Sequence, residues 1–174
     1  RCSITLTEAV FCDLVHLTGG AAALMRWGDR AEWAITLGGF HPFFRPFIPE
    51  GLREPPRLGA FWKPHDLIEL SVRVYIARTT SSLQFGFAGH LEAGASWGGL
   101  RADAEFNFLV MIAPVPRFEI DLSLRVTVFL FGCDLISASF RGALTGPQPW
   151  SIGGSVYWEV CGVDISKPLG PYEW

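Results

Sequence analysis

Histidines are the side chains of this sequence best suited to acid–base chemistry or metal binding, and there are four of them. His41 lies in GGFHPFFRP, between glycines and aromatic residues and close to Arg45. This pair could contact an anion or a carboxylate at the rim of a strand, or His41 could fix an irregular turn through hydrogen bonds to the backbone. If the chain is an enzyme, His41, Arg45 and His65 are the candidate residues, because catalytic groups favour loops held by a rigid scaffold.

The other motifs that carry chemistry are missing from the sequence. The histidines and cysteines have no metal-ligand spacing, and there is no HExxH, GxSxG, GxGxxG or Walker pattern. The sequence therefore predicts no catalytic residue, no metal and no cofactor, and it favours a protein that is not an enzyme.

Two pairs of carboxylates alternate along neighbouring segments, Asp103 with Glu105 and Glu119 with Asp121. A glycosidase-like acid and base would need two carboxyl groups about 5–10 Å apart in a cleft. On a regular strand these residues share the polar face, where no cleft is expected. We interpret them as a solvated polar surface.

Four cysteines are present, and Cys133 and Cys161 are the pair that could meet. A turn at GPQP would pair Thr145 with Trp150, which leaves the two cysteines one residue short of facing each other. A shift in register would allow a disulfide; otherwise both are free thiols, since spacing alone does not establish the geometry.

The elements that must position these residues are strands, because apolar side chains alternate along most of the chain after residue 20. The stretch FEIDLSLRVTVFLF (118–131) places an apolar residue at nearly every second position. Short turn-like links between such stretches require antiparallel pairing. The sequence predicts an all-β, long-stranded, up-and-down antiparallel meander that is a curved sheet, a sandwich or a barrel. At most one short helix is expected, within residues 5–16.

Turn residues predict the register of several hairpins. A first hairpin is expected over 21–37, with its turn at Gly28 and Asp29. A turn at Gly98 and Gly99 would place Leu91 opposite Phe106, and the APVPR turn would place Phe108 opposite Leu122, both on one apolar face. A plain two-residue turn at GCD would flip the faces, so a bulge is expected there.

The segment 38–65 differs from the rest because it contains six prolines and several aromatic residues. Proline cannot donate to a sheet ladder, so we expect an irregular segment with one short strand near LGAFW. We treat residues 1–174 as a single β domain.

Five stretches resemble an uncharacterised family, domain of unknown function 6603. They are ITLGGFHP (35–42), PRLGAFW (56–62), SSLQFGFAGHLEAG (81–94), LRADAEFNFLV (100–110) and LTGPQPW (144–150). The resemblance covers about residues 31–165, the family-like core, and leaves residues 1–30 outside it. The family occurs in very large β-rich proteins and has no assigned activity. The resemblance therefore implies a piece of a larger β-structure.

Composition excludes some partners. The net charge is −3 and there is no basic run, so we expect no nucleic-acid partner. No segment reaches the ~18 apolar residues of a membrane helix, and the N-terminus does not read as a signal peptide. The chain begins at Arg1 rather than Met, which suggests a piece of a longer protein or a processed form. The sequence does not predict in which cellular compartment the protein lies.

The main functional hypothesis is a non-enzymatic structural or binding module whose apolar sheet face packs against a partner sheet. That sheet would belong to the rest of a larger parent chain or to a second copy. A second hypothesis is a carrier of lipid or another apolar molecule in a trough hollowed by small residues, unless side chains of the proline-rich segment fill it. A third is a membrane β-barrel, which the alternating strands and terminal tryptophans would fit. The trough would be lined by Phe85, Phe87, Leu91, Phe106, Phe108 and Leu122.

Overall fold

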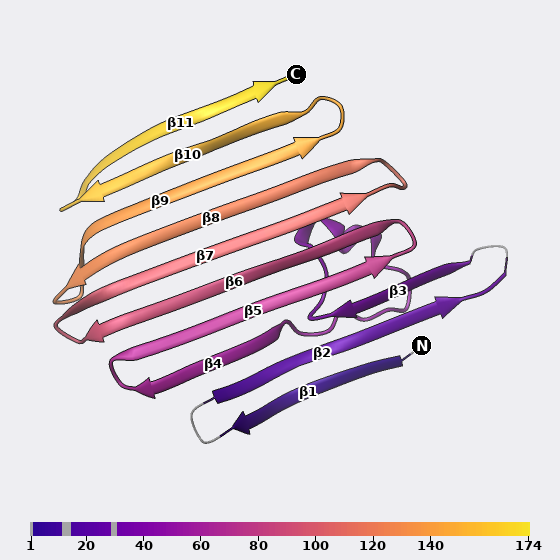
Figure 1. Cartoon of the computed structure of the whole chain (residues 1–174), viewed down its shortest axis with the longest axis horizontal. Helices are drawn as coiled ribbons and strands as arrows, with labels where there is room; N and C mark the ends of the chain where they lie inside the picture. Colours follow the sequence, from indigo (N-terminus) through magenta and orange to yellow (C-terminus); the bar gives the residue numbers. More distant parts are fainter. Residues whose placement is uncertain (1, 12–14, 29–30) are drawn as a thin grey trace.

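The protein is one antiparallel β-sheet, as the computed structural model shows for residues 2–11, 15–28 and 31–174 (Figure 1). Ten strands follow one another across the sheet in the order β1-β2-β3-β5-β6-β7-β8-β9-β10-β11, and β4 pairs with β2 and β5. The predicted all-β meander is confirmed. The strands are β1 (Cys2–Phe11), β2 (Val15–Arg26), β3 (Glu32–Leu37), β4 (Leu58–His65), β5 (Ile68–Thr79), β6 (Ser82–Ala95), β7 (Gly98–Met111), β8 (Arg117–Leu130), β9 (Cys133–Gly146), β10 (Ser151–Val160) and β11 (Val163–Glu173).

The sheet has two free edges. Within the described residues β1 pairs with β2 alone and β11 with β10 alone, so one open sheet is formed rather than two packed layers. The same part of the chain contains no helix that is long and apolar enough to cross a membrane.

The proline-rich segment leaves the sheet and returns to it. Strands β3 and β4 share the place between β2 and β5, one at each end. Between them the chain runs over one face and forms the short 3₁₀ helix η1 (Pro42–Phe47). Gly38 begins this departure with φ of 75°, and a Cβ there would lie 2.4 Å from the Val74 carbonyl oxygen, so only glycine fits. The strand predicted near LGAFW is β4.

The one short helix that the sequence allowed within residues 5–16 does not form in the described part of that segment. Residues 5–11 belong to β1, and Val15 and His16 belong to β2; residues 12–14 lie outside the described residues. The first hairpin is confirmed as β2 with β3, where Arg26 pairs with Glu32. Its predicted turn residue Asp29 also lies outside the described residues.

Two predicted registers are wrong by an even number of residues. The β6–β7 turn lies at Ser96 and Trp97, and Gly98 and Gly99 belong to β7. Leu91 is therefore opposite Ala102. Across β7 and β8, Phe106 rather than Phe108 is opposite Leu122. Because side chains alternate with period two, these shifts leave every residue on its predicted face.

The bulge expected near GCD is confirmed. Val128 pairs with Ile136 and Phe129 pairs with Asp134, so Leu135 is the extra residue. The GPQP turn places Ser151, not Trp150, opposite Thr145, a shift of one residue.

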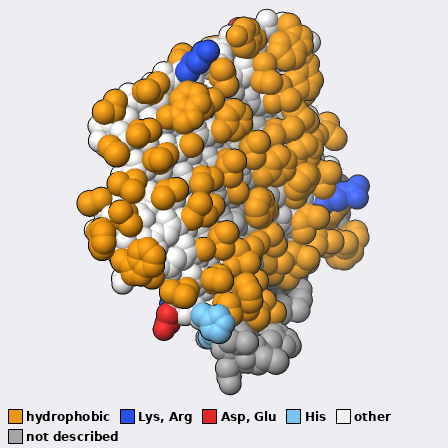
Figure 2. Space-filling model, turned by 60° about the vertical axis from the view of Figure 1, so that its left-hand side comes forward, with side chains coloured by type: hydrophobic (Ala, Val, Ile, Leu, Met, Phe, Trp, Pro, Cys, Tyr) orange, Lys and Arg blue, Asp and Glu red, His pale blue; other side chains and the backbone are white. Residues whose placement is uncertain are grey.

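One face of the sheet is apolar and open. Cross-strand partners such as Phe85 and Phe108, or Leu124 and Phe140, share it. Figure 2 shows apolar side chains gathered over a broad surface with few charged groups. We call this the apolar face. Its partly exposed large residues include Val74, Ile76, Leu83, Phe85, Phe87, Leu100, Leu122, Leu124, Val128, Ile136, Ile152, Trp158 and Val160.

The opposite face carries the segment with η1 and the buried core. Phe40 and Phe44 pack against Ala77, Leu109 and Met111, all on this second face. The proline-rich segment therefore does not fill a hollow in the apolar face, which was one of the two expectations. We call this second face the covered face.

Candidate functional site

The predicted trough residues share the apolar face. Phe85 stacks on Phe108 with ring centroids 4.6 Å apart, and Phe87 lies opposite Phe106. Phe85 is 40% exposed. The hollow expected around Gly89 is partly occupied, since a Cβ on Gly89 would lie 3.1 Å from the Phe87 ring.

An apolar hollow exists elsewhere on the sheet, between β8 and β11. It has a volume of about 290 Å³. Gly142 and Gly154 lie in its floor, and Leu122 is its one residue from the predicted trough. Its other lining residues are Ile120, Phe140, Ala143, Leu144, Ile152, Gly153, Leu169 and Tyr172.

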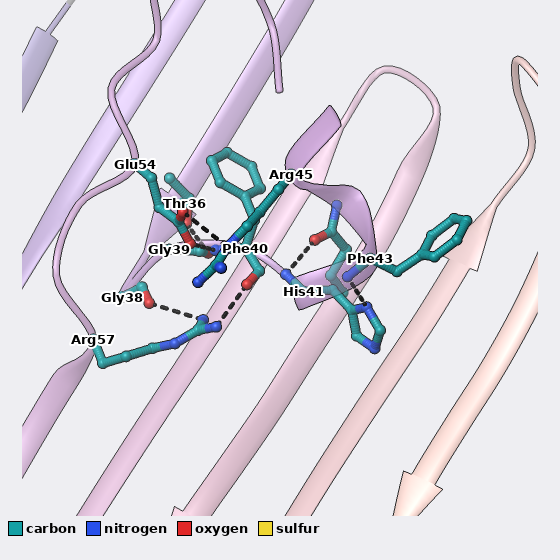
Figure 3. Close-up of polar contacts among 10 residues, drawn as sticks. Thr36, Gly38, Gly39, Phe40, His41, Phe43, Arg45, Glu54 and Arg57 are labelled. Atoms are coloured by element: carbon teal, nitrogen blue, oxygen red, sulfur yellow. Dashed lines mark hydrogen bonds and ion pairs between the residues drawn. The ribbon is translucent and has the colours of Figure 1, made fainter. Parts of the chain in front are cut away.

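His41 is the N-cap of η1 (Figure 3). Its side chain is buried, with 2% of the residue exposed. Its ring Nδ1 accepts a hydrogen bond from the backbone N–H of Phe43 at 3.2 Å. The backbone N–H of His41 donates to Gln84 Oε1 at 2.8 Å. Nε2 is buried and has no hydrogen-bond partner. Burial lowers the pKa of the imidazole, so His41 is neutral at neutral pH.

Arginine and glutamate side chains hold the backbone around His41. Arg57 donates to the carbonyl oxygens of Gly38 at 3.1 Å and Phe40 at 2.7 Å. Glu54 accepts from the Phe40 N–H at 3.3 Å and pairs with Arg45 at 3.6 Å (Figure 3). Arg45 thus serves the segment's own structure, since its contact is Glu54 rather than His41.

Glu119 and Asp121 on β8 lie beside His41. Each of the three residues offers one possible ligand atom, and these atoms lie within 4.8 Å of one another. For Glu119 and Asp121 the predicted solvated surface is therefore wrong, because this pair belongs to a partly buried cluster that sequence reasoning missed. The alternation of Glu119 and Asp121 was visible, but nothing in the sequence shows that His41 covers them.

Charge is unevenly compensated in this cluster. Arg117 Nε lies 2.6 Å from Glu119 Oε2, and the Arg117 guanidinium lies 3.8 Å from the Phe43 ring centroid. Among the described residues no arginine or lysine forms a salt bridge with Asp121. Partial burial, followed by the charge of Glu119, raises the pKa of Asp121 to about 6.

The Asp121→Asn variant is expected to be more stable than the unaltered chain above pH 6 and equally stable near pH 4. The folded state holds the Asp121 proton more tightly than the unfolded state, whose carboxyl titrates near 3.8. The contribution of the protonated Asp121 carboxyl to folding stability is therefore fully present below about pH 4, and it is lost as the pH rises toward 6. Asparagine mimics the protonated carboxyl, and after solvent screening the gain is about 1 kcal/mol. Urea unfolding of both proteins at each pH, in buffer without metal ions, measures this difference in the free energy of unfolding. An equal effect at both would contradict the assignment.

The remaining candidates lie apart from this cluster. His65 ends β4 opposite Ile68, nine residues along β5 from the Ala77 that contacts the core, or about 30 Å. His90 Nδ1 lies 2.6 Å from Asp103 Oδ1 in a cross-strand pair. The possible disulfide is not formed: Cys133 and Cys161 are both free and exposed.

Comparison with known proteins identifies a family without an assigned activity. No curated protein and no solved structure matches the chain. One family profile matches residues 3–173, and its description is a family of unknown function, DUF6603. The match extends beyond the 31–165 of the resemblance and includes the first two strands. Since it spans nearly the whole chain, the protein belongs to the DUF6603 family.

Proposed function

We propose that this chain is a non-enzymatic β-module whose apolar face packs against the apolar face of a second β-sheet. The observation that carries the proposal is the open apolar face that crosses the sheet from β5 to β10. Many large aliphatic and aromatic side chains on this face, such as Leu124, Ile136 and Trp158, are each more than one-third exposed. A monomer in water rarely exposes such a continuous surface.

The size of the apolar face supports a sheet as its partner. The six strands from β5 to β10 have 10 to 14 residues each, and at ordinary strand spacings they give a surface of roughly 1,200 Å². A stable interface needs about 800 Å² from each partner, whereas the largest apolar patch on a monomer is about 300–600 Å². Two sheets of this kind pack about 10 Å apart with interdigitating side chains.

The residues of edge strand β11 oppose the addition of a further strand at this edge, so they favour a partner that packs on the face of the sheet. It contains Pro168 and Pro171, which lack the N–H that a further strand would need. Lys167 lies opposite Val156, on the side of the apolar face, where a charge opposes edge-to-edge pairing. A partner is therefore expected on the face rather than beyond β11.

A second candidate function is binding of an apolar small molecule, which the hollow between β8 and β11 favours. The hollow has about 290 Å³ and apolar walls, whereas a cavity of about 150 Å³ already binds benzene. Its opening onto the apolar face would let a partner side chain fill it as well.

Native mass spectrometry and light scattering of the chain in detergent-free buffer test the proposal. In this sample the only available sheet is that of a second copy, so we expect a dimer or a larger assembly without bound lipid. A monomer that carries a lipid mass would favour the second candidate. A bare monomer at high concentration would contradict the second candidate and would exclude a second copy as the partner, which leaves a sheet of a larger parent chain as the partner.

A further inference from the structure

The covered face contains a group of side chains that no part of the proposed packing role uses. His41 comes from the start of η1, and Glu119 and Asp121 come from alternate positions of β8. Their possible ligand atoms lie within 4.8 Å of one another. The group therefore joins the proline-rich segment to the sheet at one point.

The histidine supplies an observation independent of the carboxylates. His41 is 2% exposed, and its Nε2 lacks a hydrogen-bond partner although more than nine-tenths of buried polar groups have one. Since Nδ1 is engaged by the Phe43 N–H, Nε2 is the nitrogen left to meet the carboxylates. Figure 3 shows this second ring nitrogen pointing away from η1.

The carboxylates supply negative charge that the neighbouring side chains offset only in part. Arg117 is paired with Glu119, while Asp121 has Glu119 as its close neighbour. Two adjacent, partly buried carboxylates repel each other unless a positive charge lies between them. A cation bound by both would remove this repulsion.

We propose that His41 Nε2 and the carboxylates of Glu119 and Asp121 bind a divalent transition-metal ion such as Zn²⁺. Imidazole nitrogen with carboxylate oxygen is a donor set that suits this class of ion, whereas Ca²⁺ and Mg²⁺ take oxygen ligands. Three protein ligands leave a fourth tetrahedral position for water. Metal bonds of 2.0–2.1 Å place ligand atoms about 3.4 Å apart, so the carboxylates must close in slightly on the ion.

The ion has a consequence for the N-terminus of η1. Binding through Nε2 moves the proton of the neutral imidazole to Nδ1, which then no longer accepts from the Phe43 N–H. The ion replaces that hydrogen bond as the attachment between η1 and the sheet. It therefore acts as a structural clamp on the proline-rich segment.

Titration of the metal-free protein with Zn²⁺ and with Co²⁺, whose absorption reports coordination, tests the site. We expect one ion per chain and a shift of the Phe43 amide signal in nuclear magnetic resonance spectra. Asp121→Asn and Glu119→Gln preserve shape, and each should weaken binding at least about tenfold, since even outer-shell substitutions weaken it by 10–100-fold. Asp103→Asn is the matched control, because it alters a carboxylate paired with a histidine, His90, on the same face.

Three results would overturn the proposal. They are an unaltered chain that binds no Zn²⁺ at millimolar concentration, an Asp121→Asn protein that binds like the unaltered chain, and binding lost in Asp103→Asn. Both carboxylate variants keep hydrogen-bonding side chains, and circular dichroism of each establishes that it is folded. Self-association is measured separately, so failure of the metal site leaves the proposed packing role intact.

Discussion

The Leu124→Glu variant is expected to stay monomeric at concentrations where the unaltered chain associates. Leu124 lies in the middle of β8 on the apolar face, opposite Ala104 and Phe140, and is 46% exposed. In a face-to-face assembly its side chain would be buried, and an unpaired buried charge costs several kcal/mol. We expect the association constant to fall at least about 100-fold. Sedimentation equilibrium measures this change.

Arg141→Glu is the matched control for this variant. Arg141 is an exposed residue of β9, opposite Ser123 on the covered face, so the same residue is introduced on the other side of the sheet. Association should change little. If both variants dissociate the assembly equally, or neither does, the apolar face is not the interface.

The Phe40→Ala variant is expected to lower the free energy of unfolding by about 3–5 kcal/mol. Phe40 is fully buried, stacks on Phe44 with centroids 5.7 Å apart and packs against Leu109. Its removal leaves a cavity between the proline-rich segment and the sheet. Domains of this kind have only about 5–15 kcal/mol of stability, so the loss is large. Urea unfolding measures it.

Phe47→Ala, in the same segment, is the control for Phe40→Ala. Phe47 is 36% exposed and contacts Phe43 and Phe44 at the surface of η1. Its truncation should lower the free energy of unfolding by less than half as much. Equal losses would show that the core does not lie beneath Phe40.

The faces of the sheet could be predicted from the sequence because alternation is a local property. Each strand from β5 to β10 carries its own apolar file, and short turns require antiparallel neighbours. The register could not be predicted as well, since Gly98 and Gly99 read as a turn but lie within β7. Ser96 and Trp97 form the turn in their place, although the local preference of hairpin turns favours Gly-Gly.

The first strand shows where local patterns fail. LTEAVFCDLVHL has apolar residues at spacings that also fit a helix, so residues 6–11 were open to a helical interpretation. They form β1 because β2 offers an edge to pair with from Val15 to Ala23. That pairing is a tertiary effect, and it overrides the local pattern.

The sequence could not predict on which face of the sheet the proline-rich segment packs, and the reason is physical. Its aromatic residues suit the apolar face, but its irregular backbone needs hydrogen-bond partners. The covered face supplies Gln84 for the His41 N–H, and small or apolar residues such as Ala77 and Leu109 sit beside it. The cluster of His41 with Glu119 and Asp121 follows from this choice of face, so it could not be predicted either.

The extra residue Leu135 determines the orientation of the last third of the molecule. If Leu135 paired with Val128 in a regular ladder instead of being bulged out, every residue of β9, β10 and β11 would change face relative to β8. Ser139 and Arg141 would then lie beside Leu122 and Leu124, and the uninterrupted apolar face would end at β8. Deleting Leu135 would make the ladder regular and leave Ile136 opposite Val128, so that variant would keep one undivided apolar surface.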